Sequence, residues 1–210
     1  MQGDELIDVI VAGRIDEAGP CAQALLDEGI AAKVIMEKYL IPAMEIVGEK
    51  FESQEYFVPE VLVSAHSMGA VLELLEPILI LNEEKPLGKV VIGTVKGDVH
   101  DIGKNIVAML LQGAGFRVIN LGADVAPETF SEAIKEHGAD ILGMSSLLTT
   151  AMSNMLSTID ILEEEGIRDK VKVMVGGAAI TPQFAEKIGA DSYGDDANEA
   201  VRIAKELVSD

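Results

Sequence analysis

The chain has 210 residues, enough for one large domain or two small ones, and 49% of them are apolar, so a buried core needs no covalent staples. Its 16 basic and 36 acidic residues give a formal net charge of −20, which argues against nucleic acid and anionic membranes as partners. Cys21 is the single cysteine, which excludes a disulfide framework and a thiolate metal cluster.

The N-terminal segment, Met1 to Glu5, is acidic and lacks the basic-then-apolar layout of a signal peptide. No uninterrupted apolar run approaches the ~20 residues that span a bilayer. We therefore expect a cytoplasmic protein with a solvated acidic surface.

Residues 1–81 carry apolar positions at helical spacing and are predicted to form an all-α helical-bundle domain. Pro59 suits the first turn of a helix, whereas Pro42 predicts a kink. The apolar stripes, which we interpret as core, are Ala18, Cys21, Leu25 and Leu26; Val34, Tyr39, Leu40 and Met44; and Val61, Ala65, Met68, Leu72 and Leu75.

A polar break at residues 82–88 is predicted to be a linker, and short apolar runs then alternate with amphipathic segments over residues 89–210. This alternation predicts a five-stranded parallel sheet covered on both faces, of the flavodoxin-like or Rossmann-like class. The expected strands are Val90–Val95, Arg117–Leu121, Ile141–Met144, Val171–Val175 and Asp191–Tyr193, and the expected helices are Gly103–Gly113, Pro127–His137, Ser153–Glu165, Thr181–Ile188 and Ala197–Leu207. The strand order cannot be read from spacing.

Unusual residues follow three of the expected strands. Asp98, His100 and Gly103 follow the first strand, a Ser145–Thr150 segment follows the third, and a Gly176-Gly177 pair follows the fourth. Ligands of open parallel sheets bind beyond the carboxyl ends of the strands, so these loops should converge on one site.

Each loop also has a purely structural interpretation. A single histidine at a strand end is more often a hydrogen-bonded surface residue than a metal ligand. Serine and threonine after a strand commonly cap the next helix, and a Gly-Gly pair usually serves a tight turn. Taken one at a time, the loops leave both interpretations open.

Taken together, the motifs resemble a known fingerprint. Asp98-x-His100-x-x-Gly103, then Ser145-x-Leu147, then Gly176-Gly177 resemble the cobalamin-binding signature of corrinoid methyltransferases. The segments 47–51 (VGEKF) and 56–61 (YFVPEV) resemble the helical cap that precedes the corrinoid domain of methionine synthase. The whole chain is similar to the free-standing corrinoid proteins of methylotrophic methyltransferase systems.

The resemblance implies a base-off/His-on corrinoid, cobalamin or a relative, with His100 as the lower ligand of cobalt and Asp98 accepting a hydrogen bond from its other nitrogen. These two would be the catalytic pair. The remaining implied contacts on this side are Gly103, Gly176 and Gly177 around the displaced nucleotide tail, Ser145 and Leu147 at the lower base, Thr149 at a corrin amide, and Asp101 and Ile102 within the longer motif, with Asp101 expected to cap the next helix.

Two positions depart from the resemblance. The serine that completes an Asp–His relay in methionine synthase corresponds to Ala151, with Thr150 adjacent, so we expect water in its place. Above the corrin, Phe51 and Val58 would shelter the methyl group. Val58 is smaller than the leucine expected there, which leaves either a looser cap or a gap filled by Tyr56 or Phe57.

The implied function is that of a methyl carrier that cycles between Co(I) and methyl-Co(III). It would take a methyl group from a donor on a substrate:corrinoid methyltransferase and pass it to an acceptor, such as tetrahydrofolate or coenzyme M, on a corrinoid:acceptor methyltransferase. A reductive activase is a further implied partner, and the linker would gate access. No turnover is expected without the partner enzymes, and the methyl donor cannot be read from the sequence.

Three alternatives remain. A mutase cobalamin-binding subunit shares the lower-ligand motif but ordinarily lacks the helical cap. A cobalamin-dependent sensor or regulator has such a cap, usually with a tryptophan, and this chain has none. A receiver-like signalling domain accounts for Asp98 and Asp101 but not for the Ser-x-Leu loop or the helical half.

Overall fold

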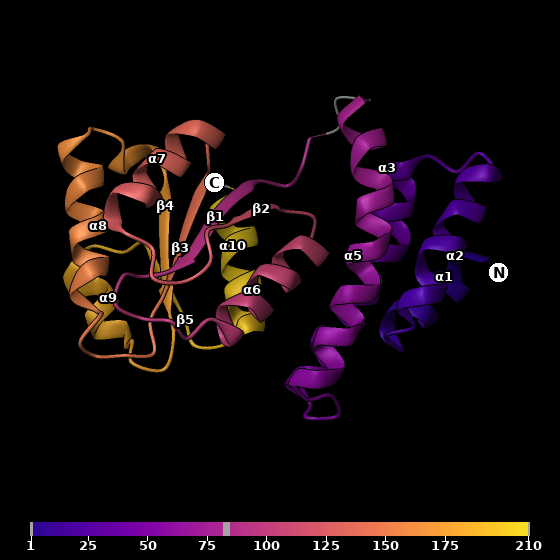
Figure 1. Cartoon of the computed structure of the whole chain (residues 1–210), viewed down its shortest axis with the longest axis horizontal. Coiled ribbons are helices and arrows are strands. Elements are labelled where there is room, and N and C mark those ends of the chain that lie inside the picture. Colours follow the sequence, from indigo (N-terminus) through magenta and orange to yellow (C-terminus); the bar gives the residue numbers. More distant parts are fainter. Residues whose placement is uncertain (1, 82–84, 210) are drawn as a thin grey trace. The chain divides into compact units, whose positions relative to one another are not determined.

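The computed structural model describes residues 2–81 and 85–209 (Figure 1). The chain divides into a helical unit, which extends to Pro86 and also takes in Gln112–Gly115, and an α/β unit, which comprises Leu87–Leu111 and the chain from Phe116 onward. Residues 82–84 of the expected linker lie outside the described residues, and residues 85–88 belong to no helix or strand. The domain boundaries at 81 and 89 stay a prediction.

The helical unit consists of α1 (Gln2–Val11), α2 (Ile15–Asp27), α3 (Ala32–Ile35), a π-helical turn (Met36–Leu40), α4 (Ile41–Glu52) and α5 (Val58–Leu81). The three apolar stripes face its interior, because each of their residues is buried or half-buried. Pro59 is the second residue of α5, as predicted. The irregularity expected at Pro42 takes the form of the π-helical turn just before it, where a proline that cannot donate a backbone hydrogen bond disturbs the helical register.

Helix α5 is the longest element of the described chain. By length and composition its Val58–Leu79 stretch could cross a membrane, but the core helix of a soluble protein meets the same criteria. Val61, Met68, Val71 and Leu75 of α5 are fully buried, and the hydroxyl of Ser64 donates to the carbonyl oxygen of Val11 at 2.9 Å. These contacts identify α5 as a packing element of the helical unit.

The α/β unit has five parallel strands in the order β2-β1-β3-β4-β5. Its elements are β1 (Lys89–Thr94), α6 (Ile102–Gly113), β2 (Arg117–Asn120), α7 (Pro127–His137), β3 (Ile141–Ser145), α8 (Ser153–Glu164), β4 (Lys172–Gly176), α9 (Pro182–Ile188), β5 (Ser192–Gly194) and α10 (Ala197–Leu207), with a short 3₁₀ turn at Arg168–Lys170. The predicted fold class is confirmed, and the expected elements agree with the observed ones to within one or two residues.

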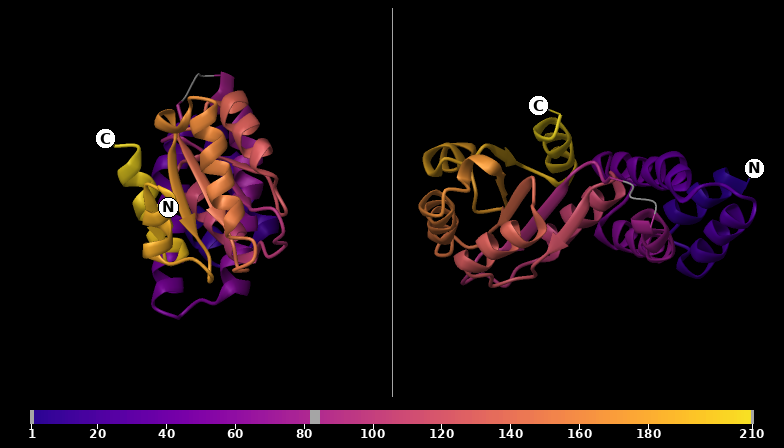
Figure 2. Two further views of the ribbon diagram at one scale, coloured as in Figure 1. Left: turned by 90° about the vertical axis from the view of Figure 1, so that its left-hand side faces the viewer. Right: turned by 90° about the horizontal axis from the view of Figure 1, so that it is seen from above.

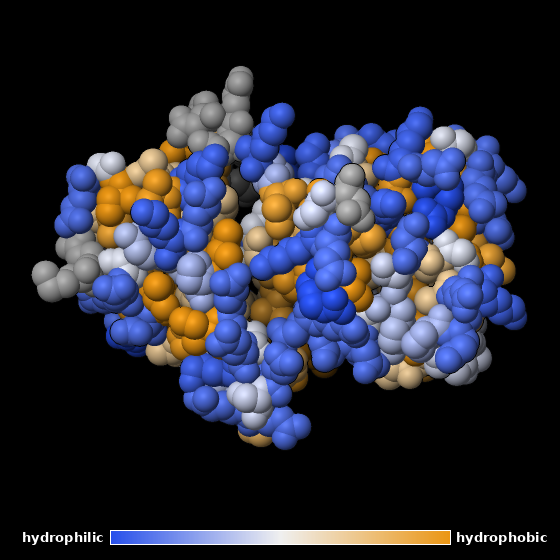
Figure 3. Space-filling model, turned by 180° about the vertical axis from the view of Figure 1, so that it is seen from behind, coloured by the Kyte–Doolittle hydropathy of each residue, from blue (hydrophilic) through white to orange (hydrophobic). Residues whose placement is uncertain are grey.

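Helices cover both faces of this sheet. Figures 1 and 2 show α7, α8 and α9 on one face and α6 and α10 on the other. The core under α7–α9 is built from alternate strand residues, such as Val91, Leu142 and Val173, packed on Phe130 and Met155. Figure 3 shows hydrophilic residues over much of the protein face that it draws, as expected for a strongly acidic chain.

The strand register brings the three candidate loops to one level. Thr94 of β1 is paired with Ser145 of β3, and Ser145 is paired with Gly176 of β4. β1 has β2 on one side and β3 on the other, so the chain leaves β1 and β3 in opposite directions. The carboxyl ends of β1 and β3 therefore flank the crevice in which doubly wound sheets bind ligands.

Candidate functional site

The loop after β1 is fixed by the chain's own backbone. The Val95 N–H donates to the Ser145 carbonyl oxygen at 3.1 Å, and the Asp98 N–H closes a turn onto the Val95 carbonyl oxygen at 3.1 Å. Gly97 has φ +84°, a conformation that favours glycine. The buried hydroxyl of Thr94 donates to the His100 carbonyl oxygen at 3.1 Å, so the turn and its far end are both held.

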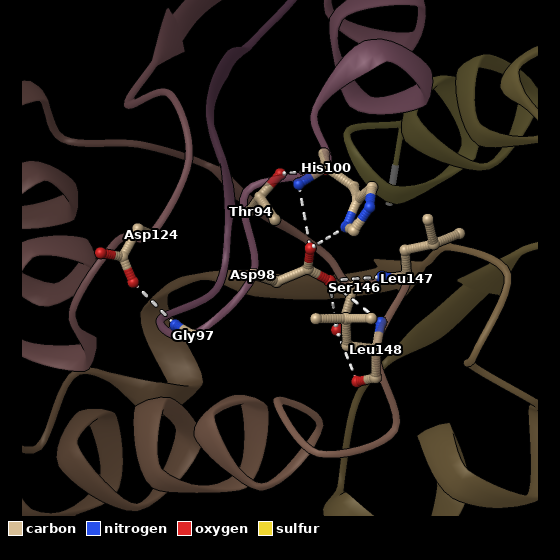
Figure 4. A network of polar contacts seen from close by, with 8 residues as sticks. All are labelled: Thr94, Gly97, Asp98, His100, Asp124, Ser146, Leu147 and Leu148. Atoms are coloured by element: carbon tan, nitrogen blue, oxygen red, sulfur yellow. Dashed lines mark hydrogen bonds and ion pairs between the residues drawn. The ribbon is translucent and has the colours of Figure 1, made fainter.

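The Asp98 carboxylate is buried and accepts five hydrogen bonds (Figure 4). Oδ1 accepts from the backbone N–H of His100 at 2.9 Å and lies 2.8 Å from its Nδ1. Oδ2 accepts from the Ser146 hydroxyl at 3.0 Å and from the N–H groups of Leu147 and Leu148 at 2.6 and 3.0 Å. Burial by itself would raise the pKa of Asp98, but the donors from His100, Leu147 and Leu148 outweigh it and hold the pKa well below its usual range.

The predicted pairing of His100 with Asp98 is thus present in the structure. With Asp98 ionised, Nδ1 of a neutral His100 carries the proton and donates it, which leaves the lone pair on Nε2. The His100 side chain is 51% exposed, so this nitrogen is accessible beyond the carboxyl edge of the sheet. A neutral imidazole oriented by a carboxylate is the usual arrangement for a metal-bound histidine.

A metal ion held by protein side chains alone does not suit this site. Among residues 2–81 and 85–209, no group of three or more His, Cys, Asp or Glu side chains could hold a metal ion. One accessible imidazole suits instead a metal that arrives with most of its ligands, as cobalt does in a corrin ring.

Sequence reasoning missed Ser146, whose hydroxyl donates to Asp98 Oδ2. The expectation that water replaces a relay serine at Ala151 stays a prediction. Ala151 is buried in the core. A Cβ added to Gly97 would lie 3.9 Å from the Ala151 Cβ. The available signal was the Ser145-Ser146 pair, which places a second hydroxyl directly beside the predicted one.

The three motif glycines differ in their surroundings. A Cβ added to Gly103, in the first turn of α6, would meet nothing within 4 Å. A Cβ on Gly177, which has φ +111°, would lie 2.3 Å from the Ser146 carbonyl oxygen, and one on Gly176 would lie 2.8 Å from that of Gly194. Gly176 and Gly177 are therefore required by the chain's own backbone, whereas Gly103 borders open space that could admit another group.

The other predicted residues of the α/β unit lie in the loops around His100 and Asp98. Ser145 is half-buried at the end of β3, and Leu147 and Thr149 are exposed in the loop that follows. Ile102, at the start of α6, is 66% exposed. The apolar side chains of Leu147 and Ile102 are thus exposed in the loops that carry Asp98, His100 and Ser146, which favours an apolar partner at this edge.

Asp101 has side-chain partners at the start of α6. Its Oδ2 accepts a hydrogen bond from the Asn105 side-chain amide at 3.0 Å and lies 4.0 Å from Lys104 Nζ. Lys104 is itself buried and donates to Asn120 Oδ1 at 2.6 Å. Burial lowers the pKa of Lys104, and the neighbouring Asp101 carboxylate partly opposes that effect. Asp101 thus belongs to a side-chain network that ties α6 to the end of β2.

The predicted cap residues belong to the helical unit. Phe51 in α4 and Val58 at the start of α5 are both half-buried. The Tyr56 hydroxyl donates to the Val11 carbonyl oxygen at 3.0 Å, and Lys50 Nζ lies 5.0 Å from the centre of the Tyr56 ring, so this side chain is held within the unit. Phe57 is 63% exposed, which makes it the freer candidate to fill a gap beside Val58.

Comparison with known proteins agrees with these features. Two family models, each described as a B12 binding domain, match residues 2–76 and 88–202. Dimethylamine corrinoid protein 2 of Methanosarcina acetivorans is 46% identical over 205 residues, which cover 97% of this chain and 94% of that protein. Trimethylamine corrinoid protein 2 of Methanosarcina mazei is 44% identical over 190 residues, which cover 90% and 87%.

Solved structures of similar proteins match nearly the whole chain. The methanol:cobalamin methyltransferase complex MtaBC from Methanosarcina barkeri contains a chain that is 31% identical, with a TM-score of 0.87, over 98% of this chain and 80% of that one. A cobalamin-binding protein from Desulfitobacterium hafniense DCB-2 is 30% identical, with a TM-score of 0.76, over 99% and 98%.

Proposed function

The chain belongs to the corrinoid proteins, the B12-binding family that serves methyltransferase systems, and on that premise we propose that it carries methyl groups on a corrinoid whose cobalt is bound by His100. The observation that carries the ligand assignment is the His100–Asp98 contact at 2.8 Å, which leaves Nε2 free and accessible. When bound, the corrinoid supplies a cobalt centre that accepts a methyl group as Co(I) and holds it as methyl-Co(III).

The proposed base-off/His-on state requires room for the nucleotide tail of the cofactor. The open space at Gly103 supports this part of the proposal. In that state, Ser145 and Leu147 would contact the lower base, Gly176 and Gly177 would line the tail channel, and Thr149 would reach a corrin amide. Asp101 and Ile102 border the same edge.

Asp98 gives His100 a constant orientation in this proposal. The carboxylate is buried and bound by five donors, so it keeps its position whether or not the imidazole is bound to a metal. The imidazole would therefore present Nε2 to the cobalt in one fixed orientation.

For the donor we propose a methylamine, delivered by a substrate:corrinoid methyltransferase. Relatives that are 44–46% identical over most of their length are named for dimethylamine and trimethylamine, whereas the methanol complex is 31% identical. A second methyltransferase would pass the methyl group to an acceptor such as tetrahydrofolate or coenzyme M. A reductive activase would restore Co(I) after oxidation. In the helical unit, Phe51 and Val58 would shelter the methyl group, and the linker would gate access to it.

A histidine exchange tests the proposal. Holoprotein reconstituted with cobalamin should show a base-off/His-on absorption spectrum, and His100→Ala should lose it because the lower nitrogen is gone. His137→Ala, which removes a half-buried histidine from the end of α7, is the control and should keep the wild-type spectrum. An unchanged spectrum in His100→Ala would refute the ligand assignment.

A further inference from the structure

The chain after β2 continues to follow β1 to the His100 loop. β2 ends at Asn120, but the Leu121 N–H still donates to the Ile92 carbonyl oxygen at 2.8 Å. The Thr94 N–H donates to the Gly122 carbonyl oxygen at 3.0 Å, and the Val125 N–H donates to the Thr94 carbonyl oxygen at 3.0 Å. The segment between Gly122 and Val125 therefore lies against the start of the loop that carries Asp98 and His100.

Asp124 binds two consecutive residues of that loop. Its Oδ1 accepts the Gly97 N–H at 2.7 Å, and its own N–H donates to the Asp98 carbonyl oxygen at 3.0 Å. Figure 4 shows the Asp124 carboxylate directed at Gly97, away from the group formed by Asp98 and His100. One residue thus fixes the backbone on both sides of the Asp98 side chain, as an acceptor before it and as a donor after it.

The backbone of Asp124 adopts a conformation that few residues take. Its φ is +55°, and among the described residues Gln54 is the one other non-glycine residue with positive φ. Aspartate and asparagine tolerate this left-handed region better than most residues, and glycine tolerates it best. The side chain that aspartate adds at this position is the one that binds Gly97.

The same segment also holds the far side of the loop. Asn120 Oδ1 accepts from buried Lys104 at 2.6 Å and from the Gly122 N–H at 3.0 Å. Lys104 is in the first turn of α6, directly after the ligand motif. The backbone between Gly97 and Lys104 is therefore anchored at both ends by residues 120–124.

From this geometry we propose that Asp124 is a positioning residue for the lower ligand. It holds the Gly97–Asp98 backbone so that Asp98 can orient His100 toward the metal. Asp124 contacts neither His100 nor the reacting atoms, and it acts through the backbone of Asp98. This inference rests on the proposed function, because it presupposes that His100 binds the cobalt.

The test measures the ratio of His-on to His-off cobalt in the holoprotein. The protein is labelled with ¹⁵N-histidine, reconstituted with cobalamin and reduced to Co(II), and the axial nitrogen coupling is read by electron paramagnetic resonance. The ¹⁵N label distinguishes the protein imidazole from the cofactor's own base. Asp124→Gly removes the carboxylate but accommodates φ +55°, so the fold is retained, and the ratio should fall about tenfold through loss of a charge-assisted hydrogen bond.

Asp124→Asn is the rescue variant, because its amide oxygen can still accept the Gly97 N–H and asparagine tolerates the same φ. It should restore a ratio close to that of the wild type. A wild-type ratio in Asp124→Gly would overturn the proposal. A fall of the ratio in Asp124→Asn as large as in Asp124→Gly would also overturn it, because the acceptor for the Gly97 N–H would be present without restoring His100 binding.

Asp140→Gly is the matched control. The Asp140 carboxylate also accepts a backbone N–H, that of Lys89 at 2.8 Å, but at the opposite end of β1. This variant should keep the wild-type ratio, and an equal loss there would show that the Asp124 effect is only one of fold stability. If the wild type itself shows no ¹⁵N coupling, the ligand assignment fails, whereas coupling in the wild type with an equal ratio in Asp124→Gly refutes this inference alone.

Discussion

At the scale of single residues, the motif glycines have different roles. Gly177 is required by the fold, whereas Gly103 is proposed to leave room for the cofactor. The Gly177 Cα faces the Ser146 backbone, and its φ of +111° is one that side chains rarely adopt. Gly103 has an ordinary helical position and open space in front of its Cα. The sequence motif presents the two glycines as equivalents, and only the register between β3 and β4 distinguishes their roles.

We predict opposite outcomes for alanine at these two positions. Gly177→Ala should lower the free energy of unfolding by about 3 kcal/mol through backbone strain and the contact with Ser146. Gly103→Ala should keep or raise the stability of the apoprotein, since alanine favours a helix over glycine by up to about 1 kcal/mol. It should nevertheless weaken cobalamin binding. Urea unfolding and a cobalamin titration measure the two effects, and wild-type affinity in Gly103→Ala would contradict the tail assignment.

Asp98 predicts how the stability of the apoprotein depends on pH. Burial would raise its pKa, but hydrogen bonds from His100, Leu147 and Leu148 outweigh that effect and make the pKa lower in the folded chain than in the unfolded chain. Its stabilising contribution is therefore complete above the unfolded pKa of about 3.9 and is lost as the pH falls through that value toward the lower folded pKa. The difference in unfolding free energy between wild type and Asp98→Asn should be largest near neutral pH and should shrink below about pH 4. A difference that stays constant from neutral to acid pH would contradict this account.

At the scale of elements, local signals predicted some boundaries and tertiary contacts determined others. α10 begins where Asp196 accepts the Glu199 N–H at 2.8 Å, and α7 begins at Pro127 and ends before Gly138 in the left-handed conformation. These caps are sequence signals, and both helices were predicted with the observed bounds. The path of residues 121–125 along β1 depends on strand order, which spacing does not reveal.

The loop between β3 and α8 shows the same limit within the site. Its place after a strand was predictable, as was its convergence with the Asp98 loop. Its resemblance motif drew attention to Ser145, whereas the hydroxyl that contacts Asp98 belongs to Ser146. The choice between the two serines depends on the path of the chain after β3, because Ser145 is the last residue of that strand and Ser146 is the first residue of the loop.

We therefore predict that alanine at Ser146 lowers the stability of the apoprotein, whereas alanine at Ser145 weakens cobalamin binding. Ser146→Ala should destabilise the apoprotein by about 1–2 kcal/mol, because one of the three donors to Asp98 Oδ2 disappears. Ser145→Ala should leave that stability close to the wild-type value and weaken cobalamin binding, if Ser145 contacts the lower base. Both variants are compared by urea unfolding without cofactor and by titration with it. A larger loss of apoprotein stability in Ser145→Ala than in Ser146→Ala would reverse the assignment.

At the scale of the whole molecule, the chain combines two units with different sequence periods. Helical spacing up to Leu81 and strand–helix alternation from Lys89 were sufficient to predict an all-α part and a doubly wound part. The proposed lower ligand, His100, and the residues that hold it lie in the α/β unit, whereas the candidate apolar cover lies in the helical unit. If methyl transfer uses both units, a substitution in the helical unit should change the stability of the methyl–cobalt bond, whose proposed lower ligand belongs to the α/β unit.

Phe51 allows this coupling to be measured. Light breaks a methyl–cobalt bond into a radical pair, and an apolar cover keeps the fragments together so that they recombine. Phe51→Ala should therefore accelerate photolysis of the methylated holoprotein severalfold under anaerobic illumination, as followed by absorbance. Leu156→Ala removes a similar apolar side chain from the surface of α8, where Leu156 is 43% exposed, and should photolyse at the wild-type rate. If Phe51→Ala photolyses no faster than Leu156→Ala while both variants bind cobalamin fully, the helical unit does not shelter the methyl group through Phe51.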